Sequence, residues 1–201
     1  MKRISAKTGL LAITALVTAC GGVLTSEQAA RQTYLLEPYA AHAADNEGET
    51  WPPLALSVSV VPGLDTDRIQ ARGPDARLNH YANARWADFL PEVLSSALRR
   101  SLAATGRFEA VKATPSPDPD DWTLELEVQQ FYGVQATAGR TSSVAAQFEG
   151  MLHCKDEDHR LQLSSSSPVG DEHLSLVVRA HQQALDDVTR QLLDQVRDYC
   201  K

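Results

Sequence analysis

The chain has 201 residues and a formal net charge of −7 at pH 7, with 43% hydrophobic and 22% charged residues. This length suits one folded domain with an extension. An acidic protein repels phosphate backbones and anionic lipid surfaces, so the charge argues against binding to nucleic acid. Beyond residue 20, no stretch of the sequence is apolar enough to predict a membrane-spanning helix.

The N-terminus has the pattern of an export signal. Lys2, Arg3 and Lys7 form a positive start, and Gly9–Val17 is an uncharged apolar run. The run is far shorter than the roughly 20 residues that a spanning helix needs. Small residues and a cysteine follow in Val17–Cys20, and this pattern resembles the lipobox of bacterial lipoproteins.

The sequence therefore predicts cleavage before Cys20 and attachment of lipid to its thiol. Residues 1–19 would be a signal peptide, residues 20–32 a lipidated tether and residues 33–201 the folded domain. The alternative is an ordinary secretory signal followed by an unrelated cysteine. Resemblance to Gram-negative lipoproteins implies the periplasmic face of the outer membrane, because the inner-membrane members usually have an aspartate where this chain has Gly21.

The first part of the domain predicts short strands. Residues 33–39 are expected to form a strand and residues 40–50 a polar loop. Apolar residues alternate with small or polar ones over Leu54–Val60, which is typical of a half-buried strand. Val61–Gly63 would end this strand, and residues 64–71 would form a loop with a short edge strand.

An apolar stripe at spacings of three and four runs through residues 86–102 and predicts a helix over about 84–104. Pro91 either kinks this helix or marks its true first turn, in which case residues 86–90 form a separate turn. Gly106 is expected to end the helix.

The second part predicts an antiparallel meander. A short strand at 107–113 and a proline-rich loop precede three alternating strands, at residues 122–129, 144–154 and 160–166. A last amphipathic helix begins near Asp171–Glu172. The sum is an α+β fold: a two-layer sandwich of a mainly antiparallel sheet, with five or six strands and two amphipathic helices on one face.

Two charged clusters raise the question of chemistry. Asp65, Asp67 and Arg68 invite an acid–base or metal-binding interpretation, but such a group is more often a solvated turn with a local ion pair. The second cluster lies around the predicted hairpin tip and comprises His153, Cys154, Asp156, Asp158 and His159. Strand parity turns Cys154 inward and His153 outward, so the side chains diverge and no metal site is predicted.

No catalytic residue or cofactor is predicted. His181 lies on the apolar stripe of the last helix, where a histidine is usually a hydrogen-bonded core residue. The chain has no Gly-x-Ser-x-Gly elbow and no phosphate-binding loop, so it is not the ATPase subunit of a transporter.

The cysteines suggest a disulfide. With Cys20 lipidated, Cys154 and Cys200 remain as an even pair in an oxidising compartment. Cys154 points inward on a strand, and Cys200 lies near the buried face of the last helix. We hypothesise that they bond and tie this helix to the sheet.

The order of several segments resembles the ABC-type transport auxiliary lipoproteins, the family of paraquat-inducible protein C. The segments are Tyr34–Leu36, Val60–Ile69, Tyr81–Leu90, Leu94–Leu102, Gly106–Phe108, Val128–Phe131 and Ala180–Leu185. The resemblance implies a non-enzymatic lipoprotein that works beside ABC or MCE-type (mammalian cell entry) systems in moving lipids between membranes. It implies an MCE-domain partner and allows self-association into a ring.

An accessory protein must present a surface to its partner. The loop Pro62–Arg68 is the candidate, because its proline and glycine fix a sharp turn and Asp65, Asp67 and Arg68 offer charge complementarity. Trp86 is a second candidate contact, against the alternative that it simply packs in the core. A lipoprotein that binds a lipid or small ligand by itself is the competing function, and a periplasmic enzyme ranks last.

Overall fold

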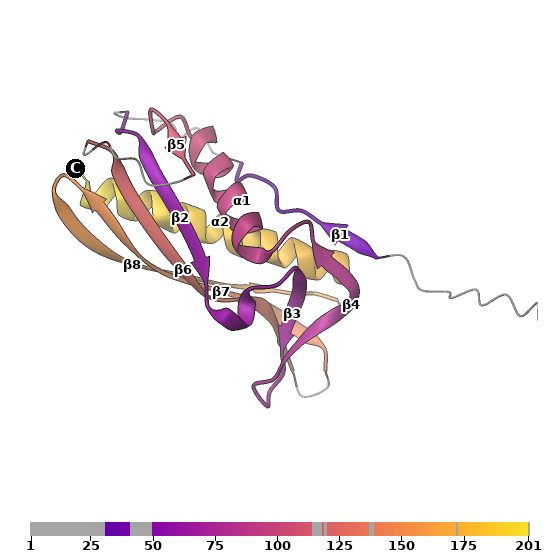
Figure 1. The fold of residues 1–201 in the computed structure, drawn as a ribbon. Coiled ribbons are helices and arrows are strands. Elements are labelled where there is room, and N and C mark those ends of the chain that lie inside the picture. Colours follow the sequence, from indigo (N-terminus) through magenta and orange to yellow (C-terminus); the bar gives the residue numbers. More distant parts are fainter. Residues whose placement is uncertain are drawn as a thin grey trace, which may run out of the picture. The chain divides into compact units, whose positions relative to one another are not determined.

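The computed structural model describes residues 31–40, 50–113, 118, 120–136, 139–171 and 173–200. They belong to a compact unit that spans Arg31–Lys201 and holds an eight-stranded sheet with two helices (Figure 1). The strands are β1 (Gln32–Tyr34), β2 (Leu54–Val60), β3 (Arg68–Arg72), β4 (Leu78–Trp86), β5 (Val111–Lys112), β6 (Trp122–Gln135), β7 (Thr141–Cys154) and β8 (Glu157–Pro168). The helices are α1 (Leu90–Ala104) and α2 (Leu174–Tyr199). In this described part of the chain, neither helix is both long and apolar enough to cross a membrane.

β6 organises the sheet. On one side it pairs with β7, which pairs with β8, and on the other side it pairs first with β2 and then with β3. β5 lies outside β2, while β4 and β1 lie outside β3. Four of the seven strand pairings between described residues are parallel, and three are antiparallel. The α+β class is confirmed, but the mainly antiparallel sheet predicted from the sequence is in fact a mixed sheet.

The predicted meander is present. β6, β7 and β8 are consecutive antiparallel neighbours, and their inward positions carry buried residues such as Leu124, Phe148 and Leu163. The turn between β7 and β8 is shorter than expected: only Lys155 and Asp156 form it, at φ angles of 51° and 63°. Two residues with positive φ are sufficient for a tight hairpin. Glu157 and Asp158 therefore belong to β8 and not to the turn.

Of the two alternatives for Pro91, the one that places it in the first turn of the helix is confirmed, but the residues before α1 differ from the prediction. Residues 84–86 end strand β4, and the helix begins at Leu90 with Pro91 in its first turn. Trp86 points inward from β4 four residues before Leu90, and this spacing imitates one more helical turn. β3 was expected at an edge, but it lies between β4 and β6. Gly106 ends α1 with a φ of 63°, as predicted.

The helices close the core and protect one edge of the sheet. α2 packs on β7 and β8, and α1 packs on β2 and touches α2. The free edge of β8 is capped by glutamines of α2: Gln191 accepts from the Ser164 N–H and donates to its carbonyl, and Gln195 donates to the Gln162 carbonyl. These bonds occupy backbone groups to which an added strand would otherwise pair.

Candidate partner-binding surface

The loop Pro62–Arg68, here called the docking loop, is held rigidly between β2 and β3. It opens with a 3-10 turn over Pro62–Leu64, whose Leu64 side chain is fully buried. At its far end the Thr66 carbonyl accepts from the Leu90 N–H over 3.1 Å. The loop is therefore anchored to the core and to the first turn of α1, as a preformed binding loop should be.

Asp67 lies between two arginines. Its carboxylate is 3.8 Å from Nε of Arg68 and 3.6 Å from Nη1 of Arg85. Arg68 and Arg85 are directly opposite each other on β3 and β4, where like charges repel. Asp67 offsets this repulsion, so its first role is structural. Arg85 belongs to the surface but was missed, because β4 was not predicted.

Asp65 differs from Asp67. It is exposed at the end of the 3-10 turn, and no ion pair to it occurs among the described residues. Its carboxylate can therefore meet a cation on another molecule without first breaking a contact within the domain.

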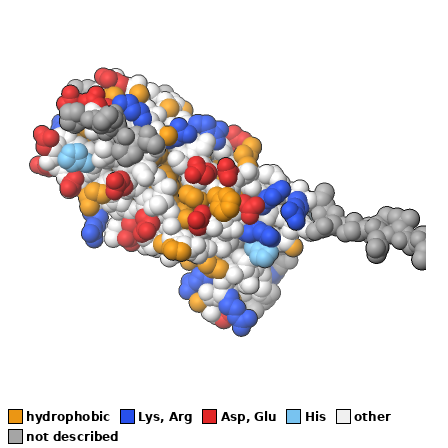
Figure 2. Space-filling view, in the orientation of Figure 1, with side chains coloured by type: hydrophobic (Ala, Val, Ile, Leu, Met, Phe, Trp, Pro, Cys, Tyr) orange, Lys and Arg blue, Asp and Glu red, His pale blue; other side chains and the backbone are white. Residues whose placement is uncertain are grey.

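An apolar patch adjoins the docking loop. Phe89 occupies the position just before α1 and is 53% exposed, and Leu35, just after β1, is 64% exposed. Leu35 lines a groove of about 240 Å³ together with Asp88 and Glu92 of the α1 start. Figure 2 shows apolar side chains ringed by acidic ones over the beginning of α1. Large exposed apolar groups with a charged rim are typical of protein-binding surfaces.

Trp86 does not belong to this surface. Its side chain is 2% exposed, and its ring contacts those of Phe131 and His181 at centroid distances of 6.2 Å and 5.3 Å. Trp86 as a partner contact is therefore wrong, and the alternative of core packing holds. Trp86 is the last residue of β4, and the strand turns its side chain toward the core. The helix predicted for this region did not reveal that orientation.

His181 is also a core residue. Its Nδ1 donates to the Val177 carbonyl over 2.9 Å, and its Nε2 is buried with no hydrogen-bond partner among the residues that the structure describes. Burial lowers the pKa of His181 to about 4, although the bond to Val177 opposes this shift. The ring is therefore neutral at pH 7 and packs as an aromatic group.

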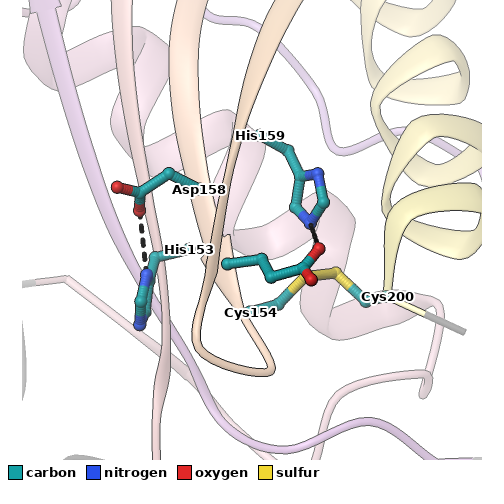
Figure 3. The surroundings of a disulfide bond; sticks show 6 residues. His153, Cys154, Asp158, His159 and Cys200 are labelled. Carbon is teal, nitrogen blue, oxygen red and sulfur yellow. Dashed lines mark hydrogen bonds and ion pairs between the residues drawn. A yellow bond between two sulfur atoms is a disulfide. The ribbon is translucent and has the colours of Figure 1, made fainter.

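The second charged cluster shows no metal-binding geometry. Figure 3 shows His153 turned toward Asp158 and away from the side of the hairpin where His159 lies. Nδ1 of His153 is 2.9 Å from Oδ1 of Asp158. His159 stacks on Tyr199 with ring centroids 4.8 Å apart. Across the described residues, no three histidine, cysteine or acidic side chains converge as metal ligands.

Cys154 and Cys200 are joined in the structure. Their Cα atoms lie 6.0 Å apart, within the range that a disulfide spans, and the bond links the end of β7 to the end of α2 (Figure 3). Cys20, the proposed lipidation site, lies outside the residues that the structure describes.

Residues 34–192 match the ABC-type transport auxiliary lipoprotein component family. The chain belongs to this family. Membership makes it an auxiliary lipoprotein of ABC transport and implies a membrane-anchored position in the cell envelope. No curated protein matches the chain.

Solved structures share the fold. A protein from Xanthomonas campestris is 21% identical, with a TM-score of 0.63, over 83% of this chain and 99% of its own. The crystal structure of an uncharacterized protein is 15% identical, with a TM-score of 0.68 and the same coverage of both chains. At these identities the likeness supports the fold alone.

Proposed function

We propose that the chain is a non-enzymatic, outer-membrane-anchored accessory protein of an ABC/MCE-type system that moves lipids between membranes. Cys20 carries the lipid anchor, and the folded domain binds an MCE-domain protein on the periplasmic face of the membrane. Family membership over residues 34–192 supports the transport role. Self-association around the partner's tunnel belongs to the same proposal.

The observation that carries the proposal is the docking loop with its neighbours. A rigid loop presents an exposed Asp65 and Arg68, and an exposed Phe89 lies at the start of the helix to which the loop is bonded. Apolar contact supplies affinity, while the charges set orientation and suppress wrong partners. The capped edge of β8 argues against docking there by strand addition.

The test is co-purification of the chain with its MCE-domain partner from the same cells. Asp65→Ala with Arg68→Ala should weaken co-purification by about tenfold, because two exposed charged contacts are lost. Folding should persist, since the Asp67–Arg85 pair and buried Leu64 are untouched. Phe89→Ala should weaken binding in the same way.

The matched control is Asp75→Ala with Arg77→Ala. These residues form an exposed ion pair of 2.7 Å in the turn between β3 and β4, so the control removes the same two charges elsewhere. It should bind and complement transport like the wild type. If the docking-loop variant also behaves like the wild type, this loop is not the docking site.

A further inference from the structure

The C-terminal end of α2 lies at the other end of the domain from β1 (Figure 1). A second recessed site is lined there by Arg197 and Cys200. It is a pocket of about 440 Å³. Its main lining side chains are Trp51, Trp122, Arg107, Lys155, Arg197 and Glu109. They come from five separate segments, so the folded chain alone creates this combination.

One wall of the pocket is aromatic and fixed in place. Trp51 packs against Phe108 and Trp122, with ring centroids 5.0 Å and 6.1 Å away. Its backbone is bonded on both sides, because its N–H donates to the Arg107 carbonyl and its carbonyl accepts from the Glu109 N–H. Trp51 and Trp122 are only 9% and 6% exposed, so a ligand would meet the exposed rims of these rings, which are held in place and need no rearrangement.

The other walls are cationic. The Arg107 side chain is 7% exposed, and its guanidinium lies 4.2 Å from the centre of the Trp51 ring. Lys155 comes from the β7–β8 turn and Arg197 from the last turn of α2, where it also binds Asp194. The pocket lining therefore contains three cations and one carboxylate, that of Glu109, in a chain with a net charge of −7, and Asp194 outside the lining pairs with Arg197.

The disulfide holds two of these cations together. Lys155 directly follows Cys154, Arg197 is one helical turn before Cys200, and Cys200 itself lines the pocket. The bond fixes the β7–β8 turn against the end of α2 (Figure 3), so it sets the spacing of the two positive side chains.

We propose that this pocket binds a small molecule that carries an anionic group on a flat or apolar body. The cations would hold a phosphate, sulfonate or carboxylate, and the tryptophans would contact the body. This inference goes beyond the proposed transport function and does not depend on it, because the pocket and the docking loop share no residue.

Phenyl phosphate is a suitable probe, since it combines the two features and is soluble in water. The lipidated full chain in phosphatidylcholine nanodiscs is titrated with phenyl phosphate, inorganic phosphate and phenol by calorimetry, with empty nanodiscs as the blank. Phenyl phosphate should bind at least about tenfold more tightly than either fragment, because both walls contribute. Equal binding of the three compounds, or none, overturns the proposal.

Variants locate the binding. Lys155→Gln and Arg197→Gln should each weaken phenyl phosphate binding by about fivefold, because each removes one partly exposed charge contact. Arg160→Gln, an exposed cation on β8 outside this pocket, is the matched control and should leave binding unchanged. Wild-type affinity in both pocket variants overturns the proposal.

Reduction tests the role of the disulfide. Dithiothreitol should lower the affinity of the wild type for phenyl phosphate by about fivefold while the fold persists, because Lys155 and Arg197 lose their fixed spacing. Unchanged affinity in fully reduced, folded protein overturns this part of the proposal.

The anion could belong to a lipid headgroup or to a free metabolite. Dihexanoyl-phosphatidylglycerol, below its micelle concentration, is therefore titrated alongside phenyl phosphate. Tighter binding of the short lipid assigns a headgroup, and tighter binding of phenyl phosphate assigns a free aromatic or planar anion. Both results support the shared chemistry, and about fivefold weaker binding of either compound by Arg197→Gln ties it to this pocket.

Discussion

Removing the disulfide between Cys154 and Cys200 should destabilise the domain by a calculable amount. The two cysteines are 46 residues apart in the sequence. In the chain-entropy model, a cross-link over a loop of this length contributes about 4 kcal/mol by restricting the unfolded chain. For a domain of this size each 1 kcal/mol shifts Tm by about 2–4 °C, so the loss should lower Tm by roughly 8–16 °C.

The assay compares urea unfolding of the wild type with and without dithiothreitol, and of Cys154→Ala with Cys200→Ala. The reduced wild type separates the cross-link from changes in packing, because Cys154 keeps its buried sulfur. Peptide mapping without reductant establishes the starting state. Two free thiols in that map, or reduced and oxidised proteins that unfold within about 1 kcal/mol of each other, would refute the reasoning.

Three further predictions concern single residues. Burial lowers the pKa of His181 from 6.5 to about 4. The unfolded chain therefore binds more protons between these pH values, so stability should fall by about 3 kcal/mol as the pH drops from about 6.5 to 4. His181→Leu should remove that slope in urea titrations at several pH values, and an unchanged slope would assign it to other groups. A Cβ at Gly150 would lie 2.3 Å from the backbone oxygen of Glu125, so Gly150→Ala should cost more than about 2 kcal/mol by urea unfolding. Gly170→Ala, with no atom within 4 Å of the added Cβ, is its control. Trp86→Ala should cost about 3–5 kcal/mol of stability, as a core truncation does; a stable variant that only loses partner binding would show that Trp86 is a surface contact after all.

The sequence predicts best where apolar residues alternate over a long strand. The β6–β7–β8 meander was predicted because each of its strands buries one face and turns most of the other to solvent. Leu54–Val60 was predicted because larger apolar residues alternate with small ones, although Ala55 on the second face is also buried. The parallel pairing of β2 with β6 was not predictable in the same way. About 60 residues separate the strands, and alternation reports which face is buried but not which neighbour is bonded.

β4 was missed because its sequence lacks that signal. Most of Leu78–Asn83 is exposed, and only Ala84 and Trp86 at its end are buried. Because β4 was not predicted, Arg85 was not recognised as part of the charge cluster around Asp67. Only the pairing of β3 with β4 brings these two residues together. The cationic pocket was not predicted for a similar reason. Its lining residues come from distant segments that carry no common motif, and only the fold brings them together.

The central claim is that this lipoprotein is a physical component of an MCE-type transport complex. It is tested most directly by cross-linking intact cells that express the tagged chain at its native level, then solubilising and purifying it. The account predicts that the MCE-domain protein elutes with the chain in comparable amounts and that Asp65→Ala with Arg68→Ala reduces this amount. Elution of the wild-type chain alone, from cells in which the MCE-domain protein still purifies with its own permease, would contradict the account.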